Sequence, residues 1–136
     1  MPMLEFGDPG ATKHVMIIGR QHPPESPGQE LWFGVDFHST QYDVFYTLDR
    51  SMETSPPGVT DKWLGHIRTE LPDYEVNDSP SGFGTPMSRN WFYRTFGAPA
   101  LIYEVGDQTD RGLIREVATT AAQGTMQILL DELEGR

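Results

Sequence analysis

The chain has 136 residues, of which 37% are hydrophobic, so it can form one compact domain with a core but not two. It contains no cysteine, which excludes disulfides, thiolate zinc ligands and cysteine nucleophiles. Twenty acidic residues against ten Lys and Arg give a formal net charge of -10, and with no basic cluster this argues against a nucleic-acid partner.

The N-terminal residues and the longest apolar runs indicate where in the cell the protein is expected. The segment from Met1 to Gly10 carries Glu5 and Asp8 and has no basic stretch followed by an apolar one, so we expect no secretory signal. The longest apolar runs are too short to span a bilayer, so we expect no membrane partner. These features predict a cytoplasmic protein with a single domain over residues 1–136.

Three apolar runs in the first part of the chain predict buried strands. The runs are Lys13 to Gly19, Leu31 to Phe37 and Val44 to Leu48, and the first is closed by its glycine. The segment between the first two runs is rich in proline, which indicates a loop. The Ser-, Pro- and Gly-rich stretch from Ser51 to Val59 indicates another loop.

The middle of the chain predicts two helices separated by a loop. Thr60 is a suitable N-cap for a helix over Asp61 to Leu71, in which apolar residues recur at helical spacing. Asn77 to Thr85 is polar and contains glycine, so it is interpreted as a loop. Met87 to Phe96 is expected to form a short helix that ends at Gly97.

The last part of the chain predicts a strand and a long helix. Ala100 to Val105 has the pattern of a buried strand. Asp110 or Thr109 then caps a helix whose apolar stripe consists of Leu113, Ile114, Val117, Ala121, Ile128 and Leu129. The alternation of strands and helices predicts an α/β fold with a mixed, mostly buried sheet flanked by helices.

Imidazole and carboxylate side chains follow three of the predicted strands. His22 and Glu25 come after the first strand, His38 after the second, and Glu104 near the end of the last. Ligands of open α/β sheets gather outside the carboxyl ends of the strands, so these side chains are candidates for one site. Two imidazoles and one carboxylate form the ligand set of an open catalytic zinc site.

Taken together, the three motifs resemble the M14 zinc carboxypeptidase family, in particular its cytosolic carboxypeptidase-like variants. The resemblance is carried by Arg20-Gln21-His22-Pro23-Pro24-Glu25, by Asp36-Phe37-His38-Ser39 and by Tyr103-Glu104-Val105-Gly106-Asp107. It implies Zn²⁺ bound by His22, Glu25 and His38, with Glu104 as the carboxylate that activates water. The reaction it implies is removal of C-terminal residues from peptides.

The chain also departs from this family. Members of the family have a long segment between the first motif and the third ligand, and that segment includes an Asn-Arg pair that binds the terminal carboxylate of the substrate. Here only Ser26 to Asp36 lies between them, which indicates an internal deletion near residues 26–30. The family's mobile tyrosine is not clearly matched by Tyr74 or Tyr93. Arg20, Arg89 and Arg94 are candidate carboxylate binders by charge alone, and none of them matches the Asn-Arg pair.

Two other functions stay open. An N-acyl amino acid deacylase shares the same ligand arrangement, and its substrate is a small N-acyl amino acid instead of a peptide. A shortened chain could instead be a catalytically silent zinc-binding or interaction module. Loss of a central strand would expose sheet edges, and these could pair in a homo-oligomer.

Each candidate residue also has a structural interpretation. His22 and Glu25 could be polar loop residues, and His38 a hydrogen-bonded residue at a strand end. Glu104 could form a salt bridge with Arg111 or Arg94. Asp36 needs a partner in an otherwise apolar strand, because burial of an unpaired carboxylate is costly. The hypothesis is that it orients a zinc-bound histidine through the second ring nitrogen.

Overall fold

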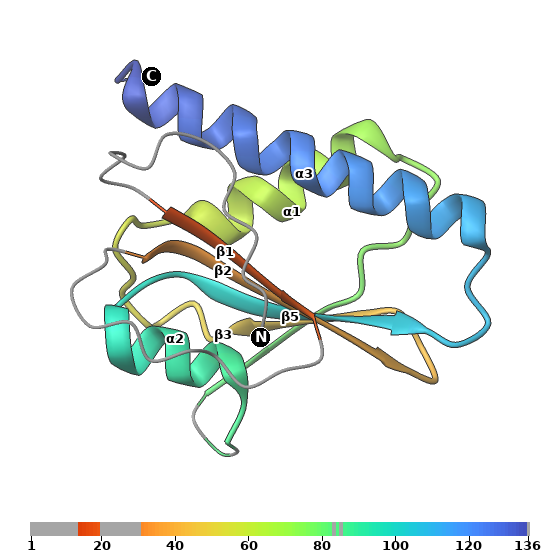
Figure 1. Ribbon diagram of the computed structural model, residues 1–136, viewed down its shortest axis with the longest axis horizontal. Helices are drawn as coiled ribbons and strands as arrows, with labels where there is room; N and C mark the ends of the chain where they lie inside the picture. The colour runs from red at the N-terminus through yellow and green to blue at the C-terminus, as the bar shows by residue number, and fades with distance from the viewer. Residues whose placement is uncertain (1–13, 20–30, 83, 85, 136) are drawn as a thin grey trace.

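The fold is a five-stranded sheet with helices on both faces (Figure 1). The computed structural model of the protein describes residues 14–19, 31–82, 84 and 86–135. The elements in chain order are β1 (His14–Gly19), β2 (Leu31–Thr40), β3 (Val44–Leu48), α1 (Val59–Glu70), β4 (Asp78–Ser81), α2 (Ser88–Phe96), β5 (Ala100–Gly106) and α3 (Arg111–Leu133).

The sheet is mixed, with the strand order β1-β2-β5-β3-β4. Strands β1, β2 and β5 are neighbours and run parallel, whereas β3 is antiparallel to β5 and parallel to β4. The prediction of an α/β fold with a mixed sheet is therefore confirmed. One consequence matters for the site: the carboxyl ends of β1, β2 and β5 lie at the same edge of the sheet.

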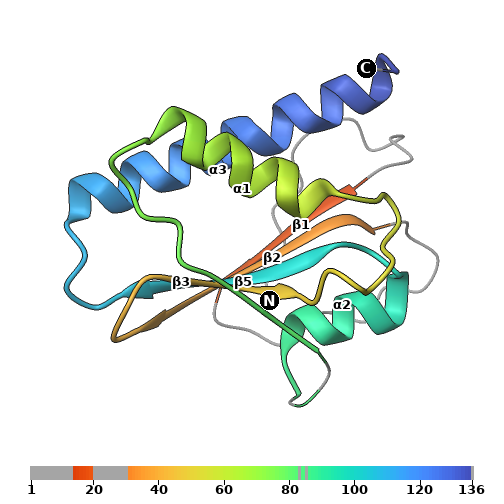
Figure 2. The same ribbon diagram turned by 180° about the vertical axis from the view of Figure 1, so that it is seen from behind.

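The helices cover the two faces unequally. Helices α1 and α3 lie side by side on one face, and α2 lies on the other (Figures 1 and 2). The larger core forms under α1 and α3, where the buried ring of Trp63 packs edge-on against Phe33 and Phe45 at centroid distances of 5.8 and 5.9 Å. The buried side chains of Phe33, Val35, Leu101 and Tyr103 belong to this cluster, so from Phe33 onward the odd-numbered residues of β2, like those of β5, face α1 and α3.

The smaller core lies between the sheet and α2. Phe92 of α2 packs directly over Gly34 of β2, and a Cβ atom at Gly34 would lie 2.8 Å from Phe92 Cδ2. Only glycine permits this close approach. Helix α2 therefore covers the even-numbered face of β2 near Gly34.

Two of the predicted helix ends are confirmed. Asp110 is the N-cap of α3, and its Oδ1 accepts hydrogen bonds from the backbone N–H groups of Gly112 (2.8 Å) and Leu113 (3.1 Å). Helix α2 ends at Gly97, whose φ of 67° lies in the left-handed region that favours glycine.

The predicted N-cap of the middle helix was wrong. Thr60 does not cap α1, which begins at Val59 after Gly58, a residue with φ 71° and no side chain to form a cap. Val59 is buried, and packing this side chain into the core places it inside the first turn. Tertiary burial thus outweighs the preference of threonine for the cap position.

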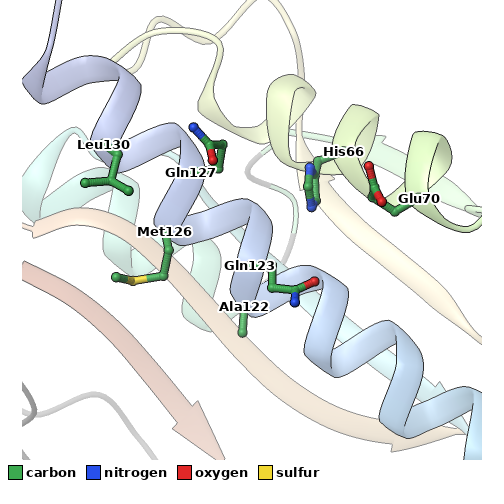
Figure 3. Close-up of a pocket in the computed structure, with 7 residues that line it drawn as sticks. All are labelled: His66, Glu70, Ala122, Gln123, Met126, Gln127 and Leu130. Carbon is green, nitrogen blue, oxygen red and sulfur yellow. The ribbon is translucent and has the colours of Figure 1, made fainter.

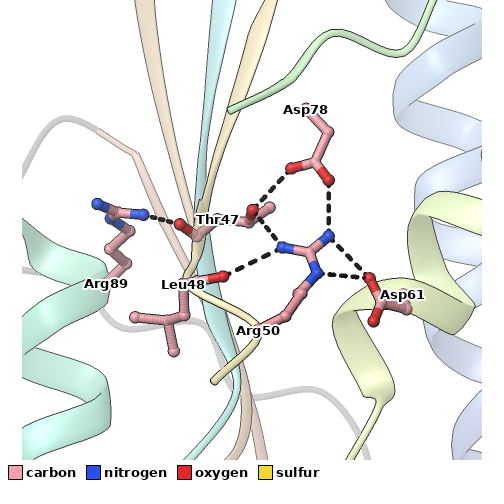
Figure 4. A network of polar contacts seen from close by, with 6 residues as sticks. All are labelled: Thr47, Leu48, Arg50, Asp61, Asp78 and Arg89. Atoms are coloured by element: carbon pink, nitrogen blue, oxygen red, sulfur yellow. Dashed lines mark hydrogen bonds and ion pairs between the residues drawn. The ribbon is translucent and has the colours of Figure 1, made fainter. Parts of the chain in front are cut away.

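The predicted loop over Asn77 to Thr85 was wrong in part, because it contains the edge strand β4. This strand is polar and includes Pro80, so its composition gives no strand signal. It pairs with β3, and Arg50 ties the edge together, as Figure 4 shows. The Arg50 guanidinium donates to Thr47 Oγ1 (2.6 Å), Asp78 Oδ2 (2.6 Å) and Asp61 Oδ1 (2.8 Å), which joins β3, β4 and α1.

Candidate functional site

The residues of the second and third motifs meet on the α2 face of the sheet. Asp36 and His38 alternate with core residues of β2, and Glu104 lies between the core residues Tyr103 and Val105 of β5. His38 lies opposite Glu104 in the parallel register, and neighbouring strands are about 4.8 Å apart. The fold therefore brings His38 and Glu104 together as cross-strand neighbours. Neither lies beyond a strand end, because β2 runs on to Thr40 and β5 to Gly106.

His38 is held by Asp36. The Nε2 atom of His38 lies 2.9 Å from Asp36 Oδ2, and the two side chains are 43% and 2% exposed. An ionised carboxylate only accepts hydrogen bonds. The carboxylate of Asp36 therefore favours the tautomer of His38 that has its proton on Nε2. In the neutral ring, the lone pair is then on Nδ1, and His38 presents that atom as a ligand or a base.

The second oxygen of Asp36 has no hydrogen-bond partner within the described part of the chain. Oδ1 is buried, as is the whole residue, which is 1% exposed. A buried carboxylate with one hydrogen bond is costly unless positive charge lies nearby. A protonated His38 would supply that charge, and so would a cation bound to this ring.

Glu104 is the second acid of this face. It is partly buried, and its carboxylate makes no hydrogen bond or ion pair within residues 14–19, 31–82, 84 and 86–135. The salt bridge to Arg111 or Arg94 is therefore not formed there.

The first motif lies outside the described residues, and so does the predicted deletion near residues 26–30. His22, Glu25 and Arg20 belong to the range 20–30. Strand β1 ends at Gly19, three residues before His22, and its last residue pairs with Phe37, next to His38. Within the described ranges, no group of three His, Cys, Asp or Glu side chains could hold a metal. A zinc centre here therefore requires ligands from the first motif.

The remaining arginine candidates have other roles. Arg89 is fully buried, and it donates hydrogen bonds to the backbone oxygen of Thr47 and to Ser81 Oγ (2.5 Å). Its burial lowers the pKa of the guanidinium. Arg94 is exposed on α2 and already has a partner. Arg89 therefore serves the packing of α2 on the β3/β4 edge.

A second polar cluster lies on the α1/α3 face, and the sequence analysis missed it. Tyr103 donates a hydrogen bond to Asp43 Oδ1 (2.7 Å), Thr109 donates to Asp43 Oδ2, and the hydroxyls of Tyr74 and Tyr103 are 3.2 Å apart. Asp43 precedes β3 and Thr109 precedes α3, so the cluster joins two connections that are distant in sequence. No local pattern could have indicated it, because its hydrogen-bonded partners are 29 to 66 residues apart.

This cluster predicts loss of stability at high pH. Burial raises the pKa of Tyr74 to about 12, and it also raises the pKa of Tyr103. Tyrosine in the unfolded chain ionises near pH 10, at about its ordinary pKa. Between these values the folded state binds more protons than the unfolded state, so the free energy of unfolding should fall as pH rises from about 10 to about 12.

The measurement is urea unfolding across this pH range. The Tyr74→Phe variant should be less sensitive to pH than the parent, because it has lost one of the two perturbed groups. The Tyr42→Phe variant is a control, since Tyr42 is exposed. Identical pH profiles for the parent and Tyr74→Phe would contradict the assignment.

Comparison of the chain with protein-family models, with curated proteins and with solved structures finds no match. In the described part of the chain, no helix has both the length and the apolar character needed to cross a membrane. The functional assignment of the site therefore depends on its geometry and on the sequence motifs.

Proposed function

We propose that the protein is a zinc-dependent hydrolase similar to the metallocarboxypeptidases, acting on the amide bond of a C-terminal residue. One observation carries the proposal: β2 and β5, which carry the second and third motifs, and β1, which precedes the first motif in the sequence, are neighbours, run parallel and end at one edge of the sheet. On the face turned away from the main core, His38 and Glu104 are paired in register. Strand ends of this kind are where open α/β sheets bind ligands.

The donor chemistry around His38 fits zinc. With Nε2 engaged by Asp36, the Nδ1 atom is left for the metal, and an outer carboxylate of this kind is the usual partner of a zinc-bound histidine. His22 and Glu25 would complete three protein ligands. Bound zinc would polarise the scissile carbonyl and lower the pKa of a water molecule.

The side chains of Asp36 and Glu104 would carry out the other steps of the reaction. Asp36 keeps the ring of His38 in one orientation and one proton form. Glu104, which has no other partner among the described residues, would accept the proton of the attacking water and return it to the nitrogen of the leaving amine. In this mechanism His38 binds the zinc ion and Glu104 transfers the proton.

The test is the zinc content of the purified protein. After reconstitution, the parent should hold about one zinc per chain, and His38→Ala should lose most of it. The Asp36→Ala variant should bind zinc about 10- to 100-fold more weakly, because the outer carboxylate orients the ligand. His66→Gln is the matched control, since His66 lies on α1, on the opposite face of the sheet.

Elemental analysis together with circular dichroism decides the outcome. A folded parent that retains no zinc, or a His38→Ala variant that retains as much as the parent, would refute the metal site. Loss of zinc in His66→Gln as well would show that the metal binds without selectivity for this site.

A further inference from the structure

Tyr46 of β3 lies on the same face of the sheet as Glu104, and the sequence analysis missed it. The preceding residue, Phe45, stacks on Tyr103 at a centroid distance of 4.3 Å and belongs to the core under α1 and α3. Because side chains alternate along a strand, Tyr46 projects from the opposite face, on the side of α2. The register agrees, since Tyr46 pairs with Ile102, two residues before Glu104 in β5.

Glu104 and Tyr46 are diagonal neighbours across two strands. Val44 is the residue of β3 directly opposite Glu104, and Tyr46 follows it by two positions. Diagonal pairs in an antiparallel sheet have Cα atoms about 7–8 Å apart, which is within reach of aromatic and long side chains. A small molecule bound over Glu104 can therefore also contact Tyr46.

The hydroxyl of Tyr46 has no hydrogen-bond partner among the described residues. The tyrosines of the opposite face differ, because the hydroxyls of Tyr74 and Tyr103 belong to the cluster around Asp43. Tyr46 is half-buried beside Ile102, which is 5% exposed, so the ring is held on the sheet while part of the side chain stays accessible. A phenol in this position can donate a hydrogen bond to a ligand.

The side chains of the candidate site offer no such donor themselves. Asp36 and Glu104 accept hydrogen bonds as carboxylates, and the Nε2–H group of His38 is engaged by Asp36. Arg89 is fully buried in the packing of α2. On the β3 side of Glu104, Tyr46 is therefore the described side chain that can donate to an oxygen atom of a bound molecule.

We propose that the hydroxyl of Tyr46 binds the free carboxylate of the C-terminal residue that the reaction releases, an inference that rests on the proposed hydrolase function. The strand order gives the direction, because the expected metal ligands belong to β1 and β2 or follow them, whereas Glu104 lies on β5 and Tyr46 on β3. Glu104 delivers a proton to the nitrogen of the leaving amine. The released residue then lies on the side of Glu104 away from the metal, which is the side of Tyr46.

This contact makes Tyr46 a specificity-determining residue. A hydrogen bond to a charged acceptor is stronger than one to a neutral acceptor, so the hydroxyl favours a free carboxylate over a C-terminal amide. A single neutral donor holds a carboxylate less firmly than the two-pronged guanidinium of an arginine. The site should therefore distinguish the carboxylate from the amide while binding it only weakly.

The experiment measures by calorimetry how the zinc-loaded protein binds free L-amino acids, which are products of the proposed reaction, and the corresponding amino acid amides. The parent should bind the amino acids more tightly than the amides. Tyr46→Phe should bind the amino acids about tenfold more weakly than the parent and the amides with a smaller change. Because phenylalanine keeps the ring, this loss belongs to the hydroxyl.

Two variants on the opposite face of the sheet serve as controls. Tyr74→Phe makes the same chemical change there and should bind the amino acids like the parent. A groove of about 540 Å³ also lies on that face between α1 and α3, with His66, Glu70 and Gln123 in its lining (Figure 3). Glu70→Gln tests whether the amino acids bind in this groove instead, and it should leave their affinity unchanged. Circular dichroism should show that all three variants fold like the parent.

The zinc content of the same samples separates this inference from the proposed function. Tyr46→Phe should hold as much zinc as the parent, because Tyr46 is not an expected ligand. Equal affinities of the parent and Tyr46→Phe for the amino acids would overturn the inference whatever the zinc content, and so would a zinc-loaded parent that binds none of them. A parent without zinc refutes the proposed function, whereas an affinity for the carboxylate that still depends on Tyr46 would support the contact.

Discussion

Replacement of Glu104 by Gln should lower hydrolysis by a factor of about 10² to 10⁴, the usual contribution of a positioned acid-base group. Gln keeps the size of the side chain but cannot take a proton from water. Because Glu104 is not one of the expected zinc ligands, the zinc content should stay the same as in the parent. The prediction follows from the place of Glu104 opposite His38, with no other partner in the described part of the chain.

The assay offers peptides with free C-termini and N-acyl amino acids to the parent and the variant at saturating zinc. Peptide turnover by the parent is expected to be weak, because Arg89 is buried in the packing of α2 and the sequence has no counterpart of the family's segment with the Asn-Arg pair. Better turnover of N-acyl amino acids would identify the substrate as a small amide. Glu53→Gln, an exposed carboxylate far from the strand pair in sequence, is the control.

Two outcomes would change the assignment. Equal turnover by the parent and Glu104→Gln would reject Glu104 as the proton carrier. No turnover by either protein, with zinc bound, would indicate a catalytically silent zinc-binding module.

Replacement of Trp63 by Ala should lower the free energy of unfolding by about 3–5 kcal/mol, which is the range for loss of a large aromatic side chain from a core. Trp63 is 1% exposed and packs against Phe33 and Phe45. Its Nε1–H also donates to the backbone oxygen of Ala121 (2.9 Å) and to Thr125 Oγ1 (3.0 Å). One side chain thus joins α1 to both the sheet and α3.

Urea unfolding monitored by circular dichroism measures this effect. Trp63→Phe should lose less stability than Trp63→Ala, because it keeps an aromatic ring in the core and loses the hydrogen bonds and only part of the ring contacts. Lys62→Ala, at the exposed neighbouring position, should change stability by less than about 0.5 kcal/mol. A Trp63→Ala variant as stable as Lys62→Ala would show that the α1 interface is not the core of the domain.

Much of the α/β framework could be predicted from local pattern. Val44 to Leu48 is a strand with the predicted bounds, and Asp110 and Gly97 mark helix ends as expected. These features depend on short-range chemistry, namely apolar strand runs, a carboxylate that accepts helix N–H bonds and a glycine that adopts positive φ. Strand β4 and the start of α1 could not be predicted, because both depend on contacts with residues distant in sequence.

The candidate site was also predictable only in part from the sequence. The sequence by itself determined which polar residues interrupt the apolar strand runs or come after them, and hence that His38, Glu104 and Asp36 are candidates; His22 and Glu25 stay predictions. Only the tertiary structure decided that β5 pairs with β2 in the register that sets Glu104 opposite His38, and that Asp43 and Tyr103 meet on the other face. The physical reason is that strand pairing depends on backbone hydrogen bonds and on core packing between segments that are distant in sequence, and neither leaves a local pattern in the chain.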